Sequence, residues 1–228
     1  MKKNKLYDLK VVSKPWGHEY VIYSDKKKLA VTFLKINPKK ETSLHCHSSK
    51  KTGFIILHGI ANVQIGIYKS NIFKYKPMSR LVFRSGLFHK LINRGDKPLY
   101  ALEFETPYNK KDLIRMKDRF GRANRPYEGI DYLKDIDKNK LKFKKPKKNE
   151  TNKYKFKNSK ITLKYISSFK EIKIIDNKSS VAILDGKILD RTGKIVINTG
   201  EVIKEKTLKI LMQNFVPYKQ ILVLKVSR

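Results

Sequence analysis

Short apolar runs separated by turn residues dominate the first half of the chain. Between residues 9 and 105 the runs are rich in Val, Ile, Leu, Phe and Tyr. They recur about every 8–12 residues, a spacing that is typical of an all-β sandwich or barrel. We therefore expect strands at Glu19–Tyr23, Leu29–Ile36, Thr42–His47, Gly53–Leu57, Ala61–Tyr68, Arg80–Arg84, His89–Asn93 and Leu99–Glu105.

The pattern changes after this run of strands. Leu113, Met116 and Phe120 follow one another at helical spacing, which predicts a short helix within residues 109–122. Residues 134–160 then hold little apolar content, and 12 of these 27 residues are Lys. Such a composition predicts a mobile, solvated linker.

A strand pattern returns between Ile161 and Val226. Its apolar runs are separated by the turn pairs Asp185-Gly186, Thr192-Gly193 and Thr199-Gly200. We predict a second, degenerate β-barrel here, and it contains no histidine. The predicted organisation is thus a barrel over residues 1–108, a helix and extension over 109–133, a linker over 134–160 and a second β domain over 161–228.

Charge widens the range of partners to consider. The chain of 228 residues has 53 Lys and Arg against 20 Asp and Glu, a formal net charge of +33. Such an excess is compatible with a polyanionic partner. The lysines form no single face, however, and no nucleic-acid-binding module is recognisable, so nucleic acid is not the expected partner. The excess still favours anionic small molecules, including sugar phosphates.

Cysteine content and hydropathy bear on the compartment. Cys46 is the single cysteine, so no disulfide within the chain is possible. The basic N-terminus is followed by no apolar stretch of the kind that marks a signal peptide, and no run is long enough for a spanning helix. We expect a cytoplasmic protein with no membrane span.

Two histidines on one predicted strand are the first chemical signal. His45 and His47 are two residues apart, so on a strand both side chains point to the same face. Such a pair suits Zn, Fe, Mn or Ni, although it is also compatible with polar residues inside a barrel. A third histidine, His89, stands in the context Gly86-x-x-His89-x-x-x-Asn93.

Four blocks of sequence resemble one known family. They are "SKPWGHEYVIY" (13–23), "SLHCHSSKKTGFIILHGIA" (43–61), "RSGLFHKLINRGDKPLYALEFET" (84–106) and "KDLIRMKDRFGR" (111–122). In this order and at these distances, they are similar to the cupin domain of type II mannose-6-phosphate isomerases. The resemblance covers about residues 11–122. It implies a jelly-roll barrel that holds one divalent metal ion, either Zn, Mn, Fe or Ni.

The resemblance also assigns roles to particular residues. The family's metal ligands fall on His45, His47 and His89, but its glutamate ligand falls on Thr52, which has no carboxylate. By the same resemblance we expect Glu103 and Lys50 to be catalytic. The expected substrate-binding residues are Arg84, Lys90 and Arg122.

The resemblance favours a metal-dependent cupin that acts on a sugar phosphate or nucleotide sugar in surface-polysaccharide synthesis. Mannose-6-phosphate isomerisation is the leading reaction, and a homodimer is the expected assembly. Because Thr52 replaces the acidic ligand, two alternatives stay open: a sugar-binding or regulatory cupin without catalysis, and an iron dioxygenase with three histidine ligands.

Overall fold

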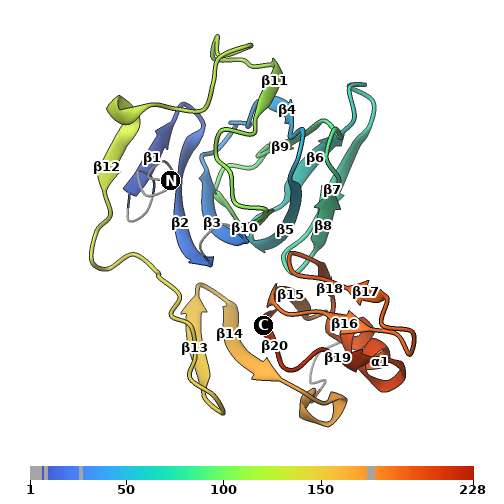
Figure 1. Cartoon of the computed structure of the whole chain (residues 1–228). Coiled ribbons are helices and arrows are strands. Elements are labelled where there is room, and N and C mark those ends of the chain that lie inside the picture. Colours follow the sequence, from blue (N-terminus) through green and yellow to red (C-terminus); the bar gives the residue numbers. More distant parts are fainter. Residues whose placement is uncertain (1–6, 8–9, 26–27, 174–177) are drawn as a thin grey trace.

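The computed structural model describes residues 7, 10–25, 28–173 and 178–228, and strands dominate it (Figure 1). Seven strands form sheet A, in the order β12 (Leu133–Asp135), β1 (Lys10–Lys14), β2 (Gly17–Asp25), β3 (Leu29–Ile36), β10 (Leu99–Thr106), β5 (Lys51–His58) and β8 (Arg80–Phe83). Five strands form sheet B, in the order β11 (Ile114–Lys117), β4 (Leu44–Cys46), β9 (His89–Ile92), β6 (Ala61–Ile65) and β7 (Ile72–Tyr75). The predicted all-β fold is confirmed.

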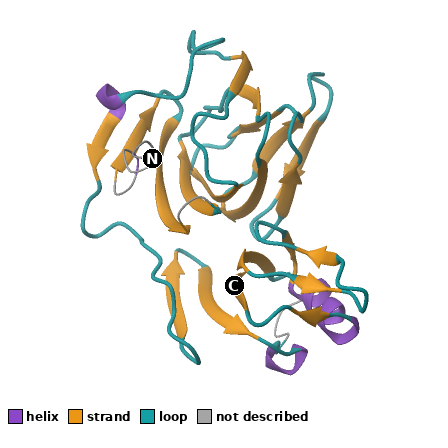
Figure 2. Ribbon diagram, viewed as in Figure 1, coloured by secondary structure: helices purple, strands orange, loops and turns teal. Residues whose placement is uncertain are grey.

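The last third of the described chain forms two further sheets and the α-helix (Figure 2). Sheet C has the order β13 (Thr151–Phe156), β14 (Ser159–Ile166), β20 (Ile221–Ser227), β15 (Ser180–Asp185) and β18 (Val202–Lys204). Sheet D has the order β17 (Ile195–Ile197), β16 (Ile188–Leu189) and β19 (Val216–Pro217). The helical elements are α1 (Glu205–Asn214) and the short 3₁₀ helices η2 (Ile130–Tyr132) and η3 (Phe169–Glu171).

The central strands of sheet A, β3 and β10, are buried on both faces. On β10, Leu99 and Ala101 belong to an apolar cluster shared with Val63 and Leu91 of sheet B. Leu102 and other residues of the opposite face belong to a cluster shared with sheet C. This explains why β3 and β10 are apolar at nearly every position rather than at every second one.

A close contact joins sheets A and C. Gly53 of β5 lies so near Val202 of β18 that a Cβ atom on the glycine would come within 2.5 Å of the valine Cγ2. The absence of a side chain at Gly53 therefore sets how closely the two sheets approach.

The predicted helix at residues 109–122 is wrong. This stretch contains strand β11, which pairs with β4. Arg115 is buried between exposed Ile114 and Met116, because neighbouring side chains of a strand point to opposite faces. The spacing of Leu113, Met116 and Phe120 is misleading, because the residue that this segment buries on β11 is Arg115 and not Met116.

The lysine-rich stretch 134–160 is only partly the solvated linker that its composition predicts. It includes strand β13, and Phe143 is buried in the cluster between sheets A and C. The Phe143 N–H also donates a hydrogen bond to the Ile22 carbonyl at 2.9 Å. Phe143, together with partly buried Leu141 and Tyr154, thus fastens this lysine-rich segment to the core.

The second half also differs from its prediction. The three glycines of the predicted turn pairs, Gly186, Gly193 and Gly200, do have positive φ angles of 94°, 83° and 85°. The described strands nevertheless form separate sheets rather than a closed barrel, and helix α1 lies among them. Leu208 and Met212 are four residues apart on one face of that helix and pack into the core between it and sheet C.

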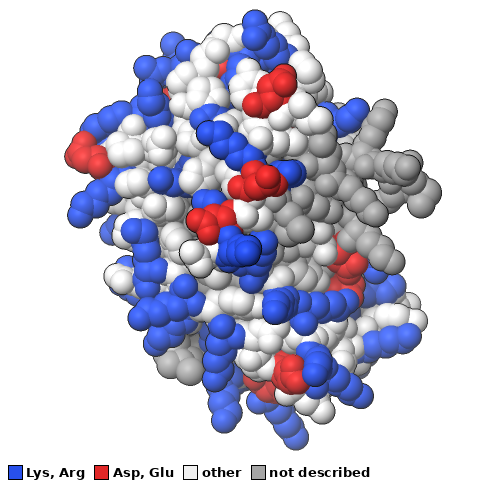
Figure 3. Space-filling model, turned by 90° about the vertical axis from the view of Figure 1, so that its left-hand side faces the viewer, with Lys and Arg blue, Asp and Glu red and all other residues white. Residues whose placement is uncertain are grey.

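Charged side chains are spread over the face that carries β12 and β13 rather than gathered into one patch (Figure 3). Among the described residues, no helix has the length and apolar character that crossing a membrane requires.

Candidate metal centre and cavity

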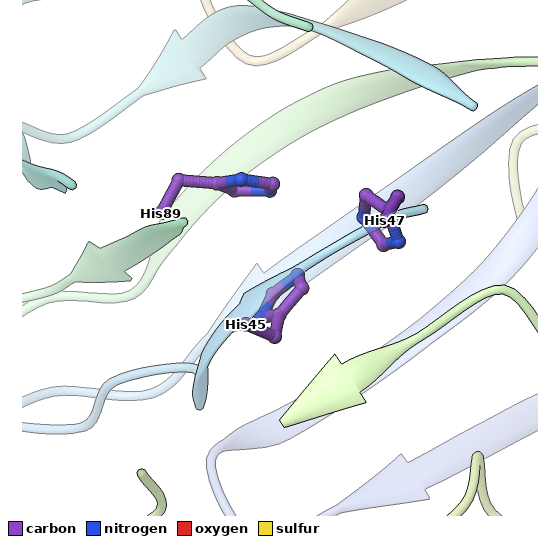
Figure 4. A group of neighbouring side chains, drawn as sticks. All are labelled: His45, His47 and His89. Atoms are coloured by element: carbon purple, nitrogen blue, oxygen red, sulfur yellow. The ribbon is translucent and has the colours of Figure 1, made fainter. Parts of the chain in front are cut away.

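Three histidine side chains converge at one end of sheet B (Figure 4). His45 of β4 and His89 of β9 are direct partners across the ladder, with ring centroids 4.6 Å apart. The His47 ring lies 5.1 Å from that of His45 and 5.4 Å from that of His89. One candidate ligand atom from each residue lies within 4.8 Å of the other two. Strand pairing and the two-residue period together therefore build the cluster.

Each histidine is oriented by a main-chain carbonyl. The Nδ1 atoms of His45 and His89 lie 2.9 Å from the carbonyl oxygens of Ser43 and Leu87. The Nδ1 atom of His47 lies 2.6 Å from the carbonyl oxygen of Asp112. A carbonyl oxygen only accepts, so each Nδ1 donates its hydrogen and each Nε2 keeps a free electron pair. This is the tautomer that a metal-ligating histidine needs.

Burial keeps the three rings uncharged. It lowers the pKa of His47 to about 3 and of His89 to about 4, and it holds the pKa of His45 well below its usual value. The Nε2 atoms of His47 and His89 are buried and have no hydrogen-bond partner. Buried polar atoms are rarely left in this state, and a bound metal ion would satisfy both. The residues therefore fit a divalent metal.

Thr52 occupies the position at which the family resemblance would place a glutamate ligand, and it supplies no carboxylate. Thr52 is fully buried on β5, and its hydroxyl oxygen has no hydrogen-bond partner. Phe83, its partner on β8, stacks on His89 with ring centroids 4.3 Å apart and an interplanar angle of 6°. An aromatic ring thus supports the third histidine on the side where Thr52 stands.

A cavity adjoins the cluster and is lined by His45 and His47; its empty volume, counted together with the open solvent at its mouth, is about 560 Å³. It lies between sheets A and B and is partly covered by residues 107–133, which we call the strap. Trp16 and Phe54 supply apolar wall, while Tyr127 and several charged residues come from the strap and sheet A. The charged lining residues are Lys14, Glu19, Lys50, Glu103, Glu105, Lys110, Arg115 and Arg122.

Glu105 lies at the centre of the buried ion pairs. Its two carboxylate oxygens accept hydrogen bonds from Lys50 Nζ and Lys110 Nζ, each at 2.6 Å. Burial alone would raise the pKa of Glu105, but the two ammonium groups lower it well below its usual value. Lys110 also lies 3.4 Å from Glu19. The hydrogen bond to Glu105 fixes the ammonium group of Lys50 in the cavity that His45 and His47 also line.

Glu128 joins the strap to sheet A in a second set of ion pairs. Its carboxylate accepts from Arg115 at 2.9 Å and from Arg122 at 2.5 Å, and it also pairs with Lys14 of β1. Lys14 lies over the Tyr127 ring, 3.8 Å from its centroid. Glu128 carries only one negative charge, but Lys14 and Arg122 have second partners in Glu19 and Asp118, so these buried charges are compensated.

Glu103 differs from the other carboxylates. It faces the cavity two residues before Glu105 on β10 and forms no ion pair among the described residues. Burial, and next the nearby charge of Glu105, raises the pKa of Glu103 to about 8. The site therefore offers a carboxyl group that exchanges its proton close to neutral pH.

The structure places some of the residues predicted to bind substrate outside the cavity. Arg122 lines the cavity, but Arg84 is exposed in the turn after β8. Lys90 lies on the opposite face of β9 from His89 and pairs with Glu41 at 2.9 Å. Successive residues of a strand point to opposite faces, so Lys90 could not share the face of His89.

Several charged residues that line the cavity, or pair with residues that line it, were not predicted from the sequence. Lys14, Arg115 and Glu128 are buried charges whose partners lie far away along the chain or on an irregular segment. Lys14 and Arg115 do fall inside the first and fourth blocks of the family resemblance, and that position is a usable signal. Glu128 lies outside every block and had none.

Comparison with known sequences identifies the family. The sequence profile described as mannose-6-phosphate isomerase C-terminal matches residues 2–118, just over half of the chain. The chain belongs to this family. The cupin resemblance inferred from the four blocks is thereby confirmed at the level of family. No curated protein matches the chain significantly.

Several solved structures are similar to part of the chain. A conserved protein from Klebsiella pneumoniae with a double-stranded β-helix domain is 19% identical, with a TM-score of 0.37, and the match covers 40% of this chain and 76% of that one. Capsular polysaccharide assembling protein CapF from Staphylococcus aureus is 14% identical, with a TM-score of 0.41 and coverage of 47% and 34%. A sugar phosphate isomerase, so described provisionally, from Acidithiobacillus ferrooxidans is 19% identical, with a TM-score of 0.33 and coverage of 38% and 55%. This chain thus spans about a third of CapF and about half of that isomerase.

Proposed function

We propose that the protein is a metal-dependent cupin isomerase that acts on a sugar phosphate, with mannose 6-phosphate as the first substrate to test. The observation that carries this proposal is the set of three histidines, each with its Nδ1 atom bonded to a main-chain carbonyl. They stand beside a cavity that also contains a buried carboxyl group with a raised pKa. Membership of the family supports the same reaction class.

His45, His47 and His89 would hold the metal ion through their Nε2 atoms. A divalent metal, when bound, would polarise the sugar oxygens next to the reacting carbons. Zn, Fe, Mn and Ni all accept imidazole ligands. Three neutral rings leave the charge of the ion uncompensated, which favours a ligand oxygen that carries or develops negative charge.

Glu103 is the proposed proton carrier. In aldose–ketose isomerisation its carboxylate would take the proton from C2, while the C2–H electrons form the C1–C2 double bond and the charge moves to O1. The O2 proton passes to O1, and Glu103 returns its proton to C1. A pKa of about 8 suits both halves of this exchange near neutral pH. The fixed ammonium group of Lys50 would stabilise negative charge that develops near the histidines.

Arg122 is the cavity residue that we propose for contact with the phosphate. It is the most exposed of the cations in the paired cluster, with 12% of its side chain accessible, and its guanidinium reaches Asp118 and Glu128. A phosphate would share this arginine with the carboxylates. We place the reaction in surface-polysaccharide synthesis in the cytoplasm, with a sugar phosphate or nucleotide sugar as ligand and a homodimer as the assembly to test.

One observation favours a second candidate. Thr52 leaves the three histidines without an acidic ligand, an arrangement that also suits an iron dioxygenase with three histidine ligands. A cupin that binds sugar without catalysis is the other alternative. Oxygen uptake in the presence of Fe²⁺ separates the dioxygenase from the isomerase.

The test is turnover of mannose 6-phosphate by protein loaded separately with Zn²⁺, Mn²⁺, Fe²⁺ or Ni²⁺. Isomerisation should depend on the metal and should be accompanied by exchange of the C2 hydrogen with solvent. Both signals should disappear in Glu103→Gln, while metal content stays at about one ion per chain. Metal binding without turnover of any sugar phosphate would instead support the non-catalytic alternative.

A further inference from the structure

Asp112 of the strap makes an unusual number of contacts with the turn that follows β4. Its Oδ1 atom accepts hydrogen bonds from the Ser48 N–H at 2.7 Å and the Ser48 hydroxyl at 2.8 Å. Its Oδ2 atom accepts from the Ser49 N–H at 3.0 Å and the Lys50 N–H at 2.8 Å. Three consecutive main-chain N–H groups thus point at one carboxylate, which defines the shape of this turn.

The same residue also touches the histidine cluster. The main-chain carbonyl of Asp112 accepts the hydrogen of His47 Nδ1 at 2.6 Å. The Asp112 carboxylate binds the main chain of residues 48–50, and the Asp112 carbonyl binds the His47 ring. One residue therefore fixes both the His47 side chain and the main chain at Lys50. The four hydrogen bonds of the carboxylate in turn keep that carbonyl in place.

We infer that Asp112 is a positioning residue that couples the strap to metal binding at the three histidines. This inference rests on the metal site of the proposed function, but not on the reaction. If Asp112 orients His47 for the metal, then the bound metal must stabilise the docked strap by the same free energy. The strap carries Arg115, Tyr127 and other cavity residues, so the metal would also order one wall of the cavity.

The variant that tests this coupling is Asp112→Asn. Asparagine has nearly the same shape, but its NH₂ group cannot accept from the Ser49 and Lys50 N–H groups. The main-chain carbonyl remains, so the variant removes its anchor rather than the hydrogen-bond partner of His47. Changes in the groups that orient a metal ligand typically reduce affinity about 10- to 100-fold.

Asp118→Asn is the matched control. Asp118 lies in the same strap, is partly buried where Asp112 is buried, and accepts hydrogen bonds from the Phe120 and Arg122 N–H groups. Its bonds stay within the strap, and none reaches the turn that carries the histidines. It therefore measures the effect of weakening the strap alone.

The first measurement is Co²⁺ affinity and the visible Co²⁺ spectrum of the full chain. Asp112→Asn should bind about tenfold more weakly or worse, with an altered spectrum, whereas Asp118→Asn should stay within about twofold of wild type. In wild-type protein, hydrogen exchange of residues 107–133 should slow when Co²⁺ is added, and this effect should be lost in Asp112→Asn. Equal Co²⁺ affinity and equal spectra for wild type and Asp112→Asn would overturn the inference. A rate of hydrogen exchange in the wild-type strap that does not change on addition of Co²⁺ would overturn it as well.

A metal-free readout separates this inference from the proposed function. In ¹⁵N NMR of the histidine rings, His47 of wild type should carry its hydrogen on Nδ1, and Asp112→Asn should show a mixture of tautomers. If the wild type binds no metal, the proposed function fails and the coupling fails with it. A fixed tautomer that Asp112→Asn does not change would refute even the positioning role.

Discussion

Thr52 and Glu105 lie directly opposite each other on the β5–β10 ladder. The family resemblance would place a glutamate at position 52, where this chain has Thr52. Glu105 lies one strand away on the same face, so it is the carboxylate nearest to that position along the ladder. Glu105 is occupied by Lys50 and Lys110, so it acts as the counter-charge of two buried ammonium groups. A glutamate at Thr52 would place two negative charges face to face, and such pairs are destabilising.

Replacing Glu105 should therefore be costly. Glu105→Gln would leave the ammonium groups of Lys50 and Lys110 buried without a full partner, and we expect a loss of about 3–5 kcal/mol in the free energy of unfolding. Urea unfolding measures it. Glu150→Gln, at an exposed glutamate, should change stability by less than about 0.5 kcal/mol. A loss at Glu105 as small as that at Glu150 would contradict the buried ion-pair assignment.

Glu103 should give the protein a pH dependence near neutrality. Its pKa of about 8 in the folded state lies above the ordinary value of 4.5, so the folded state binds the proton more tightly. The resulting stabilisation is present at acidic pH and is lost as pH rises from about 4.5 through 8. Compared with wild type, Glu103→Gln should therefore gain relative stability between pH 5 and pH 9 in urea unfolding. Parallel curves for the two proteins would show that Glu103 titrates normally.

Metal ions should raise the unfolding temperature through the histidine cluster alone. A ligand at 100 times its dissociation constant adds about 2.7 kcal/mol to stability. Thermal unfolding with and without Zn²⁺ should show this shift in wild type and not in His89→Ala. His58→Ala provides the control, because His58 lies on β5 outside the cluster. A shift that survives in His89→Ala would mean that the ion binds elsewhere.

The contact between sheets A and C predicts a pair of variants. Gly53→Ala would force its Cβ against Val202, and such overpacking typically costs about 1–3 kcal/mol. Adding Val202→Ala should recover part of the loss, since the smaller side chain opens the space. Chemical unfolding of the two single variants and the double variant yields the coupling energy. Simple additivity would indicate that the two residues do not restrict each other.

The success of sequence reasoning here follows the range of the interactions involved. A short apolar run bounded by polar residues is a local pattern, so the strand at Leu29–Ile36 was predicted with the bounds that it has. The alternation of side chains along a strand is also local. Applied to β9, it would have placed Lys90 on the opposite face from His89. Strands β1 and β7 were missed, because they are only five and four residues long and too short to show a clear pattern.

The buried charges lay beyond this reasoning for a different reason. Lys14 and Glu128 are 114 residues apart, and nothing local in either segment indicates that the other will neutralise it. Without that partner, a buried lysine is unfavourable, so a sequence-based analysis places it at the surface. The histidine cluster could be anticipated only because the spacing of its members matched a known pattern.

The burial of β3 and β10 on both faces has a consequence for how the chain can be divided. Leu102 and Phe104 of β10, with Val31 of β3, are fully buried beneath sheet C. A fragment that ends before β13 would expose this wall to water across several adjacent strands. Contiguous apolar surface of that kind drives self-association. The part of the chain that carries the histidines thus depends on the part that lacks them for its solubility.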